Sequence, residues 1–126
     1  MINGRVTEDL KAKINITISV GDGIWNSLDI VVDTGFNGQL ALPEETVQSL
    51  GLVLDRFRRV TPAIGGTRVV ASGYVHLRRA EVSMRARVIQ AGTEPLIGMA
   101  LLLNHRITID AVADGAVSIT PLGGRT

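Results

Sequence analysis

Hydrophobic and polar residues alternate along much of the chain, and this period of two predicts strands. From Ile14 to Val20 every second residue is β-branched and apolar, so these side chains would share one face of a strand. The run from Ile24 to Val32 ends in three apolar residues in a row, which is typical of a strand buried on both faces. The extended pattern returns at Leu40–Leu42 and over residues 57–60, 67–71, 74–77, 80–89, 107–109 and 117–120.

Two short helices are expected to interrupt this pattern. Pro43 and Gly51 bracket one segment, and because proline suits the start of a helix and glycine its end, a helix is predicted near residues 43–50. A second short helix is predicted near residues 99–103. The pattern as a whole predicts an all-β fold, a closed or nearly closed barrel-like sandwich with one or two short helices, built by a single domain of residues 1–126.

Composition agrees with one small soluble domain. The chain has 126 residues, of which 45% are hydrophobic, 20% charged and 3% aromatic, and 14 are glycine. These values favour a turn-rich domain with an aliphatic core. Thirteen lysines and arginines against twelve acidic residues give a net charge of +1, so nothing favours nucleic acid as a partner.

The residues that usually bind metals are scarce. The chain has no cysteine, and only His76 and His105 offer an imidazole, so we expect neither a metal nor a cofactor. The N-terminus lacks the basic and then apolar order of a secretory signal, and the longest apolar run, 96–103, is too short to span a membrane. These features lead to the expectation of a cytoplasmic protein without membrane contact.

The candidate chemistry lies at Asp33-Thr34-Gly35, directly after the buried strand. A carboxylate at this point is costly unless it is paired or used. A chain of this length would contain the tripeptide by chance roughly twice in a hundred sequences. Here it is followed by the strand Leu40–Leu42, by a hairpin with a glycine tip and by Leu96-Ile97-Gly98. The alternative is a structural role, in which Asp33 only caps a turn.

The segment Val32-Asp33-Thr34-Gly35-Phe36-Asn37-Gly38, followed by Leu40-Ala41-Leu42-Pro43, resembles the retropepsin-like aspartic proteases, in particular small prokaryotic members. The resemblance runs from about residue 14 to residue 120. It implies an aspartic endopeptidase that hydrolyses peptide or protein substrates. By this resemblance Asp33 is catalytic, Thr34 braces two catalytic loops against each other, and Gly35 lets the substrate backbone approach.

The same resemblance assigns roles to two later segments. Residues 61–67 would form the flap, and its tip, Ile64-Gly65-Gly66, would close over the substrate. Leu96, Ile97 and Gly98 would pack beneath the catalytic loop. An ordinary hairpin turn would need the same glycines, so the flap supports the assignment of Asp33 but does not establish it.

Peptide hydrolysis in this class needs two carboxylates that share one proton around a water molecule. The chain carries one such triplet, so the second Asp33 would come from a second copy in a homodimer with twofold symmetry. The polar tail 121–126 is unlike the interleaved chain ends of retroviral enzymes. We therefore expect a different interface, with residues 117–120 as a candidate edge.

Two positions depart from the retroviral pattern. Phe36 stands where those enzymes have a small residue, and its ring would narrow or block the first substrate pockets. Asn37 replaces an acidic residue that holds the substrate backbone, although an amide can also form such a bond. Both are candidate substrate-binding residues. Phe36 motivates the alternative function, a catalytically inactive dimeric module for peptide binding or assembly.

Other distinctive residues are expected to be structural. Trp25 should anchor packing, and residues 101–103 should belong to the core. The arginines at 56, 58, 59, 78, 79, 85 and 87 are expected to lie on solvated strand faces rather than to bind nucleic acid, because few aromatic residues are present for base stacking.

Overall fold

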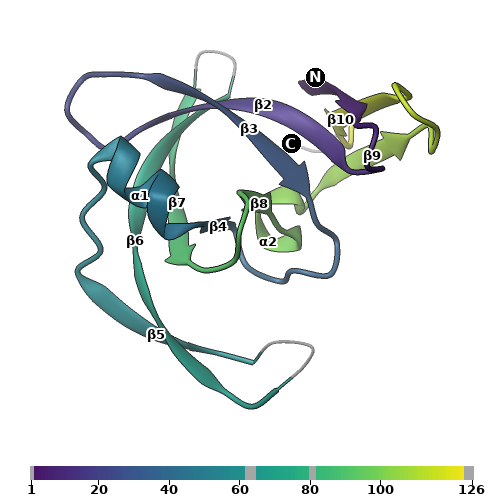
Figure 1. The fold of residues 1–126 in the computed structure, drawn as a ribbon. Coiled ribbons are helices and arrows are strands. Elements are labelled where there is room, and N and C mark those ends of the chain that lie inside the picture. Colours follow the sequence, from purple (N-terminus) through teal and green to yellow (C-terminus); the bar gives the residue numbers. More distant parts are fainter. Residues whose placement is uncertain (1, 62–64, 80–81, 124–126) are drawn as a thin grey trace.

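A computed structural model describes residues 2–61, 65–79 and 82–123. The chain folds into strands with two short helices (Figure 1). The strands are β1 (Ile2–Val6), β2 (Ala12–Ser19), β3 (Asn26–Val32), β4 (Leu40–Leu42), β5 (Arg56–Val60), β6 (Arg68–Arg79), β7 (Val82–Gln90), β8 (Leu96–Ile97), β9 (His105–Ile109) and β10 (Ala116–Pro121). The helices are α1 (Glu44–Leu50) and α2 (Met99–Leu102).

The strands form one sheet in the order β5-β6-β7-β4-β8-β3-β2-β1-β10-β9, and β6 also pairs with β2. That additional pairing joins β6, β7, β4, β8, β3 and β2 into a closed ring, as the sequence predicts. β5 and the adjoining part of β6 project from the ring as a two-stranded arm, whereas β1, β10 and β9 extend the sheet beyond β2 (Figure 1).

Much of the core lies inside this ring, and the same cluster continues to Val6 of β1 and to Val117 and Ile119 of β10. Ile14, Ile16 and Ile18 alternate along β2 and are all buried, which confirms the predicted face of that strand. Ile30 of β3 and Val88 of β7 are fully enclosed beside them. Each such aliphatic side chain stabilises the fold by roughly 1.5–3 kcal/mol relative to an exposed position.

Both helices occur where they are predicted. α1 follows Pro43 and ends at Gly51, whose φ of 69° is left-handed and whose N–H bonds the Gln48 carbonyl. α2 is a single turn that buries its last residue, Leu102. The prediction that the core includes residue 103 is wrong, because the chain leaves the helix there and Leu103 is 67% exposed.

Two features of the sheet were not predicted from the sequence: strand β1, and the continuity of β6 from Arg68 to Arg79. β1 pairs with both β2 and β10, and a Cβ on Gly4 would collide with the Lys13 carbonyl, so close strand approach needs glycine there. β6 runs unbroken through Gly73, where a Cβ would lie 2.8 Å from the Val53 carbonyl oxygen. The glycine that resembled a break thus permits a backbone to pass close by.

The suggested edge at residues 117–120 is also wrong for the single chain. β10 lies between β1 and β9 and pairs with both, so its backbone groups are already used. The edge strand at this end of the sheet is β9.

Candidate active site

The loop that carries Asp33 is fixed by backbone hydrogen bonds to β8. β3 and β8 are parallel, and the Asp33 N–H donates to the Ile97 carbonyl at 3.0 Å. The Asp33 carboxylate in turn accepts the Gly35 N–H at 2.9 Å, while its carbonyl accepts the Phe36 N–H at 3.2 Å. The carboxylate is thus held in a tight turn at the end of a buried strand.

Gly98 and Gly38 make room for the Phe36 ring beneath this turn. A Cβ on Gly98 would lie 2.5 Å from Phe36 Cδ2, and one on Gly38 would lie 2.5 Å from its Cζ. The Met99 N–H donates to the Phe36 carbonyl at 2.8 Å, and the Gly98 N–H donates to the Gln39 carbonyl at 2.9 Å. Leu96-Ile97-Gly98 therefore packs against the Asp33 loop, where the sequence places it.

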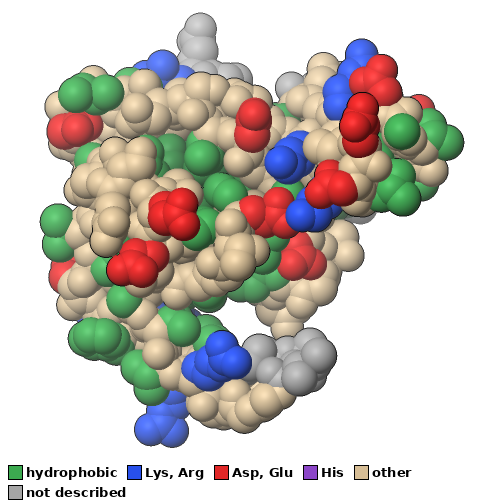
Figure 2. Space-filling model, in the orientation of Figure 1, with side chains coloured by type: hydrophobic (Ala, Val, Ile, Leu, Met, Phe, Trp, Pro, Cys, Tyr) green, Lys and Arg blue, Asp and Glu red, His purple; other side chains and the backbone are tan. Residues whose placement is uncertain are grey.

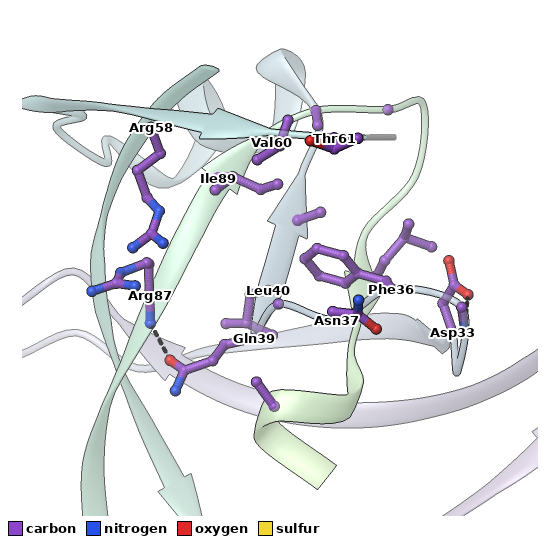
Figure 3. A pocket seen from close by; sticks show the side chains of 17 residues that line it. Asp33, Phe36, Asn37, Gln39, Leu40, Arg58, Val60, Thr61, Arg87 and Ile89 are labelled. Atoms are coloured by element: carbon purple, nitrogen blue, oxygen red, sulfur yellow. Dashed lines mark hydrogen bonds between the residues drawn. The ribbon is translucent and has the colours of Figure 1, made fainter. Parts of the chain in front are cut away.

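A cavity of about 760 Å³ opens between this loop and the arm. Asp33, Phe36 and Asn37 line it from the loop, while Val60 and Thr61 line it from the arm (Figure 3). The Phe36 ring is part of this lining (Figure 3). We call this cavity the groove.

Two arginines also line the groove. Arg58 of β5 and Arg87 of β7 point into it at the end away from Asp33 (Figure 3). Arg58 is exposed, as the sequence predicts, and Arg87 is half-buried. That both line one groove was not predicted. Alternation shows only which residues share a face of one strand, whereas the pairing of β5, β6 and β7 brings both arginines to the same cavity.

A second hollow of about 400 Å³ lies on the other side of Asp33. It is lined largely by apolar side chains, among them Leu10, Val32, Ile109 and Ala111. Leu10 is 70% exposed and Ile109 is 41% exposed. β9, β10 and the turn between them form what we call the β9–β10 lobe. It contributes Ile109 and Ala111 to this hollow, and it presents apolar side chains on the surface in Figure 2. Asp33 thus lies where the groove and an exposed apolar surface meet.

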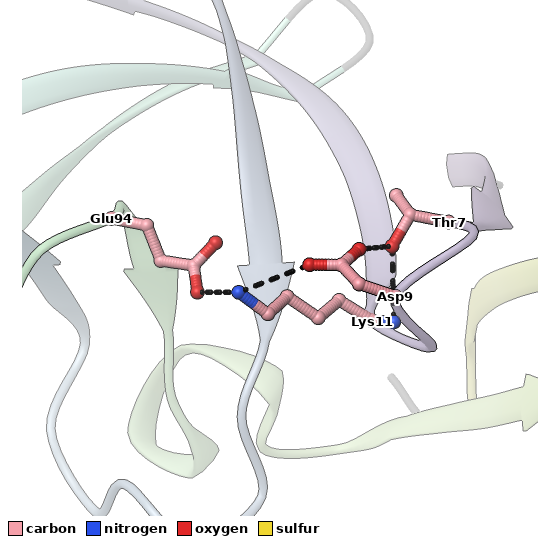
Figure 4. A network of polar contacts seen from close by, with 4 residues as sticks. All are labelled: Thr7, Asp9, Lys11 and Glu94. Carbon is pink, nitrogen blue, oxygen red and sulfur yellow. Dashed lines mark hydrogen bonds and ion pairs between the residues drawn. The ribbon is translucent and has the colours of Figure 1, made fainter.

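A polar network links the β1–β2 turn to the loop before β8 (Figure 4). The Lys11 ammonium contacts Glu94 at 2.5 Å and Asp9 at 3.4 Å, and the Thr7 hydroxyl donates to Asp9 at 2.5 Å. The Thr7 hydroxyl, aided by Lys11, holds the pKa of Asp9 below its usual 3.8. Glu94, aided by Asp9, raises the pKa of Lys11 above 10.5.

Several predicted site residues meet at the groove, and others do not. Asp33, Gly35, Phe36, Asn37 and Leu96 line it, whereas Ile97 is buried beneath it. Thr34 is exposed and outside the lining, and so are Gly65 and Gly66 of the arm. Ile64 and the rest of residues 62–64 lie outside the described residues. The predicted hairpin strands on either side are confirmed by the pairing of β5 with β6.

Within the described residues, no three histidine, aspartate or glutamate side chains gather as they would to hold a metal ion. The described part of the chain also has no helix of the length and apolarity that a membrane crossing requires.

Comparison with known proteins identifies the fold. No family model matches the sequence, and no curated protein matches it significantly. Among solved structures, the fold is similar to the crystal structure of a retropepsin-like aspartic protease from Rickettsia conorii, with a TM-score of 0.61. The match covers 94% of this chain and 89% of that chain at 19% sequence identity. The chain therefore has the retropepsin-like fold, as the motif predicts.

Proposed function

We propose that this protein is an aspartic endopeptidase whose active site forms from Asp33 of two identical chains. The observation that carries the proposal is the placement of Asp33. Its carboxylate is held at the edge of an open groove on a retropepsin-like fold, in a turn bonded to β8. Among the described residues, Asp33 is also the one acidic side chain that lines the groove.

The chemistry requires a second carboxylate facing the first. In the proposed dimer the ionised Asp33 takes a proton from a water molecule as the water oxygen attacks the peptide carbonyl carbon. The protonated Asp33 donates a hydrogen bond to the carbonyl oxygen and stabilises the charge that develops there. Protonation of the amide nitrogen then allows the C–N bond to break, which yields a new carboxyl end and a new amino end.

The apolar hollow beside Asp33 supports a second copy as the partner. A twofold axis near Asp33 would bring each copy's Leu10, Ile109 and Ala111 against the other, so that the exposed apolar surface is covered at the place where the dyad forms. Thr34, which is exposed beside Asp33, would then face its own counterpart across the axis.

Cleavage of an unstructured protein pool between about pH 4 and 7 tests this proposal, because a dyad that shares a proton fits acid to near-neutral pH. Wild type should produce new termini that mass spectrometry detects, and Asp33→Asn should produce none while retaining its melting temperature. Asp29→Asn, on the exposed face of β3, is the matched control and should cut normally. Equal cutting by Asp33→Asn would refute the assignment, and no cutting by folded wild type would favour the peptide-binding alternative.

A further inference from the structure

We propose that the groove selects acidic peptides, through a basic subsite formed by Arg58 and Arg87. This inference rests on the proposed function for one point, that the peptide lies along the groove past Asp33. The subsite itself is a property of the described surface. It names a substrate class: extended segments that carry aspartate or glutamate a few residues from the bond that faces Asp33.

The strand register places the basic side chains on one face. β5 and β7 both pair with β6: Arg58 of β5 lies opposite Val70, and Arg87 of β7 lies opposite Tyr74. Val70 and Tyr74 are four residues apart on β6 and therefore share a face. Alternate residues of a strand share a face, so this face also carries Arg56 and Arg85. It is the face that turns toward the groove, since Arg58 and Arg87 line the cavity.

Neither groove arginine is neutralised within the described part of the chain. The two ion pairs of the described residues both belong to Lys11, so neither Arg58 nor Arg87 forms an ion pair with a described carboxylate. The groove lining therefore holds two guanidinium groups against the single carboxylate of Asp33, and these charges lie at opposite ends (Figure 3). Figure 2 likewise shows basic side chains on the projecting arm.

Arg87 is also positioned in advance. Its guanidinium donates to the Tyr74 hydroxyl at 3.1 Å, and its backbone N–H donates to the Gln39 side-chain oxygen at 2.6 Å. The Arg85 guanidinium carbon lies 4.1 Å from the centre of the Tyr74 ring. This contact holds the tyrosine whose hydroxyl accepts the bond from Arg87. A guanidinium held in place loses less conformational freedom when it binds a carboxylate, which favours a charge-assisted hydrogen bond there.

Twofold symmetry would repeat the subsite. If two copies share one active site, each contributes its Arg58 and Arg87, and the combined groove is basic at both ends with the two Asp33 residues between them. The preferred substrate then carries acidic residues on both sides of the cleaved bond.

Peptide binding tests the subsite separately from catalysis. Two fluorescein-labelled twelve-residue peptides of one Gly-Ser-Val-Leu sequence would differ only in bearing glutamate or glutamine at the third and tenth positions. In the Asp33→Asn background, which prevents cleavage, fluorescence anisotropy should show the glutamate peptide binding about 3- to 10-fold more tightly at low salt. High salt should reduce this ratio because screening weakens exposed charge pairs.

Variants locate the effect. Arg58→Gln with Arg87→Gln should bring the ratio of affinities close to one, and Arg58→Gln alone, which leaves the Tyr74 contact intact, should lower it. Arg58→Glu should favour a peptide with lysine at the same positions. The control pair, Arg59→Gln with Arg106→Gln, removes the same charge from exposed sites outside the groove and should keep the ratio.

The outcomes separate this inference from the proposed function. Equal affinity for both peptides, no measurable binding of either, or the same loss of preference in the control pair would overturn the basic subsite. Cleavage by wild type without enrichment of acidic residues near the cuts would do so too and would leave the protease assignment standing. A glutamate preference that depends on Arg58 and Arg87, in a protein that cuts nothing, would support the subsite and refute the endopeptidase.

Discussion

At the scale of single residues, the site depends on glycines that let larger side chains pack closely. The Asp33 carboxylate is oriented by the Gly35 N–H, and the loop behind it is shaped around the Phe36 ring. That the Phe36 ring narrows the first substrate pockets stays a prediction. The ring lines the groove, and Gly38 and Gly98 leave the space that it occupies. These contacts make glycine at position 98 a structural requirement of the site.

Gly98→Ala should therefore destabilise the fold by about 1–3 kcal/mol, since overpacking displaces both the Phe36 ring and the Gly38 carbonyl. Urea unfolding would show this as a lower midpoint at an unchanged slope. Combined with Phe36→Ala, the loss should be smaller than the sum of the two single losses, because the ring contact is removed and the carbonyl contact remains. Gly123→Ala, with nothing within 4 Å of the added carbon, should have little effect, and an equal loss there would contradict this reading.

At the scale of elements, the sequence pattern predicts those strands and helices that depend on residues close together in the chain. The period of two in β2 and the proline and glycine around α1 each concern neighbours in sequence, and both elements form as predicted. β1 could not be predicted in this way, because its five residues become a strand by pairing with β2 and the distant β10. The groove arginines were missed for the same reason, since register between strands and not alternation within one brings Arg58 and Arg87 to one cavity.

The candidate site shows the same difference between what neighbouring residues predict and what depends on distant contacts. The resemblance of the motif locates Asp33, Phe36, Asn37 and Leu96, and the structure brings all four to the groove. Their proposed roles stay predictions. The motif gives no information on the network of Thr7, Asp9, Lys11 and Glu94. Thr7, Asp9 and Lys11 are near neighbours in sequence, but Glu94 joins them only because the β1–β2 turn meets the loop before β8.

This network predicts a pH response at the β1–β2 turn. Because the pKa of Asp9 is lowered in the folded protein, its contribution to stability is complete above about 3.8 and is lost as the pH falls through the lower folded value. The raised pKa of Lys11 acts in the opposite sense: its contribution is complete below 10.5 and is lost as the pH rises through the higher folded value. Neither group should change stability near neutral pH.

Thr7→Val should raise the pKa of Asp9 toward 3.8, because the Thr7 hydroxyl is the main cause of its lowering. Carboxyl chemical shifts followed by NMR during an acid titration measure this directly. Glu94→Gln leaves that hydroxyl in place and should move the Asp9 titration less. A Thr7→Val protein in which Asp9 titrates as in wild type would show that the hydroxyl bond does not persist in solution.

At the scale of the whole molecule, the arm and the β9–β10 lobe both reach the neighbourhood of Asp33. Residues of the arm line the groove that includes Asp33, and residues of the lobe line the apolar hollow that includes it. One chain supplies one carboxylate at their junction. The two hollows thus have different proposed occupants, a peptide in the groove and a second copy of this chain on the apolar surface.

Leu10→Asp with Ile109→Asp should shift the protein from dimer to monomer and reduce peptide cleavage by at least about tenfold, because two charges would be buried in the proposed interface. Sedimentation velocity and the cleavage assay measure the two effects. Both side chains are exposed in the single chain, so the melting temperature of the monomer should change little. The control pair, Val53→Asp with Val82→Asp, changes apolar residues elsewhere that are also exposed, and it should remain dimeric and active. A monomeric wild type that cuts peptides would contradict the interface.

The most direct measurement mixes wild type with Asp33→Asn at equal amounts and fixed total concentration, under conditions in which subunits exchange. If each active site needs Asp33 from two chains, only wild-type pairs are active, and statistics predict about one quarter of the wild-type rate. If each chain acts alone, the rate should be about one half. A rate near one quarter that is reached as exchange proceeds is the predicted result, and a steady rate near one half would contradict the shared dyad.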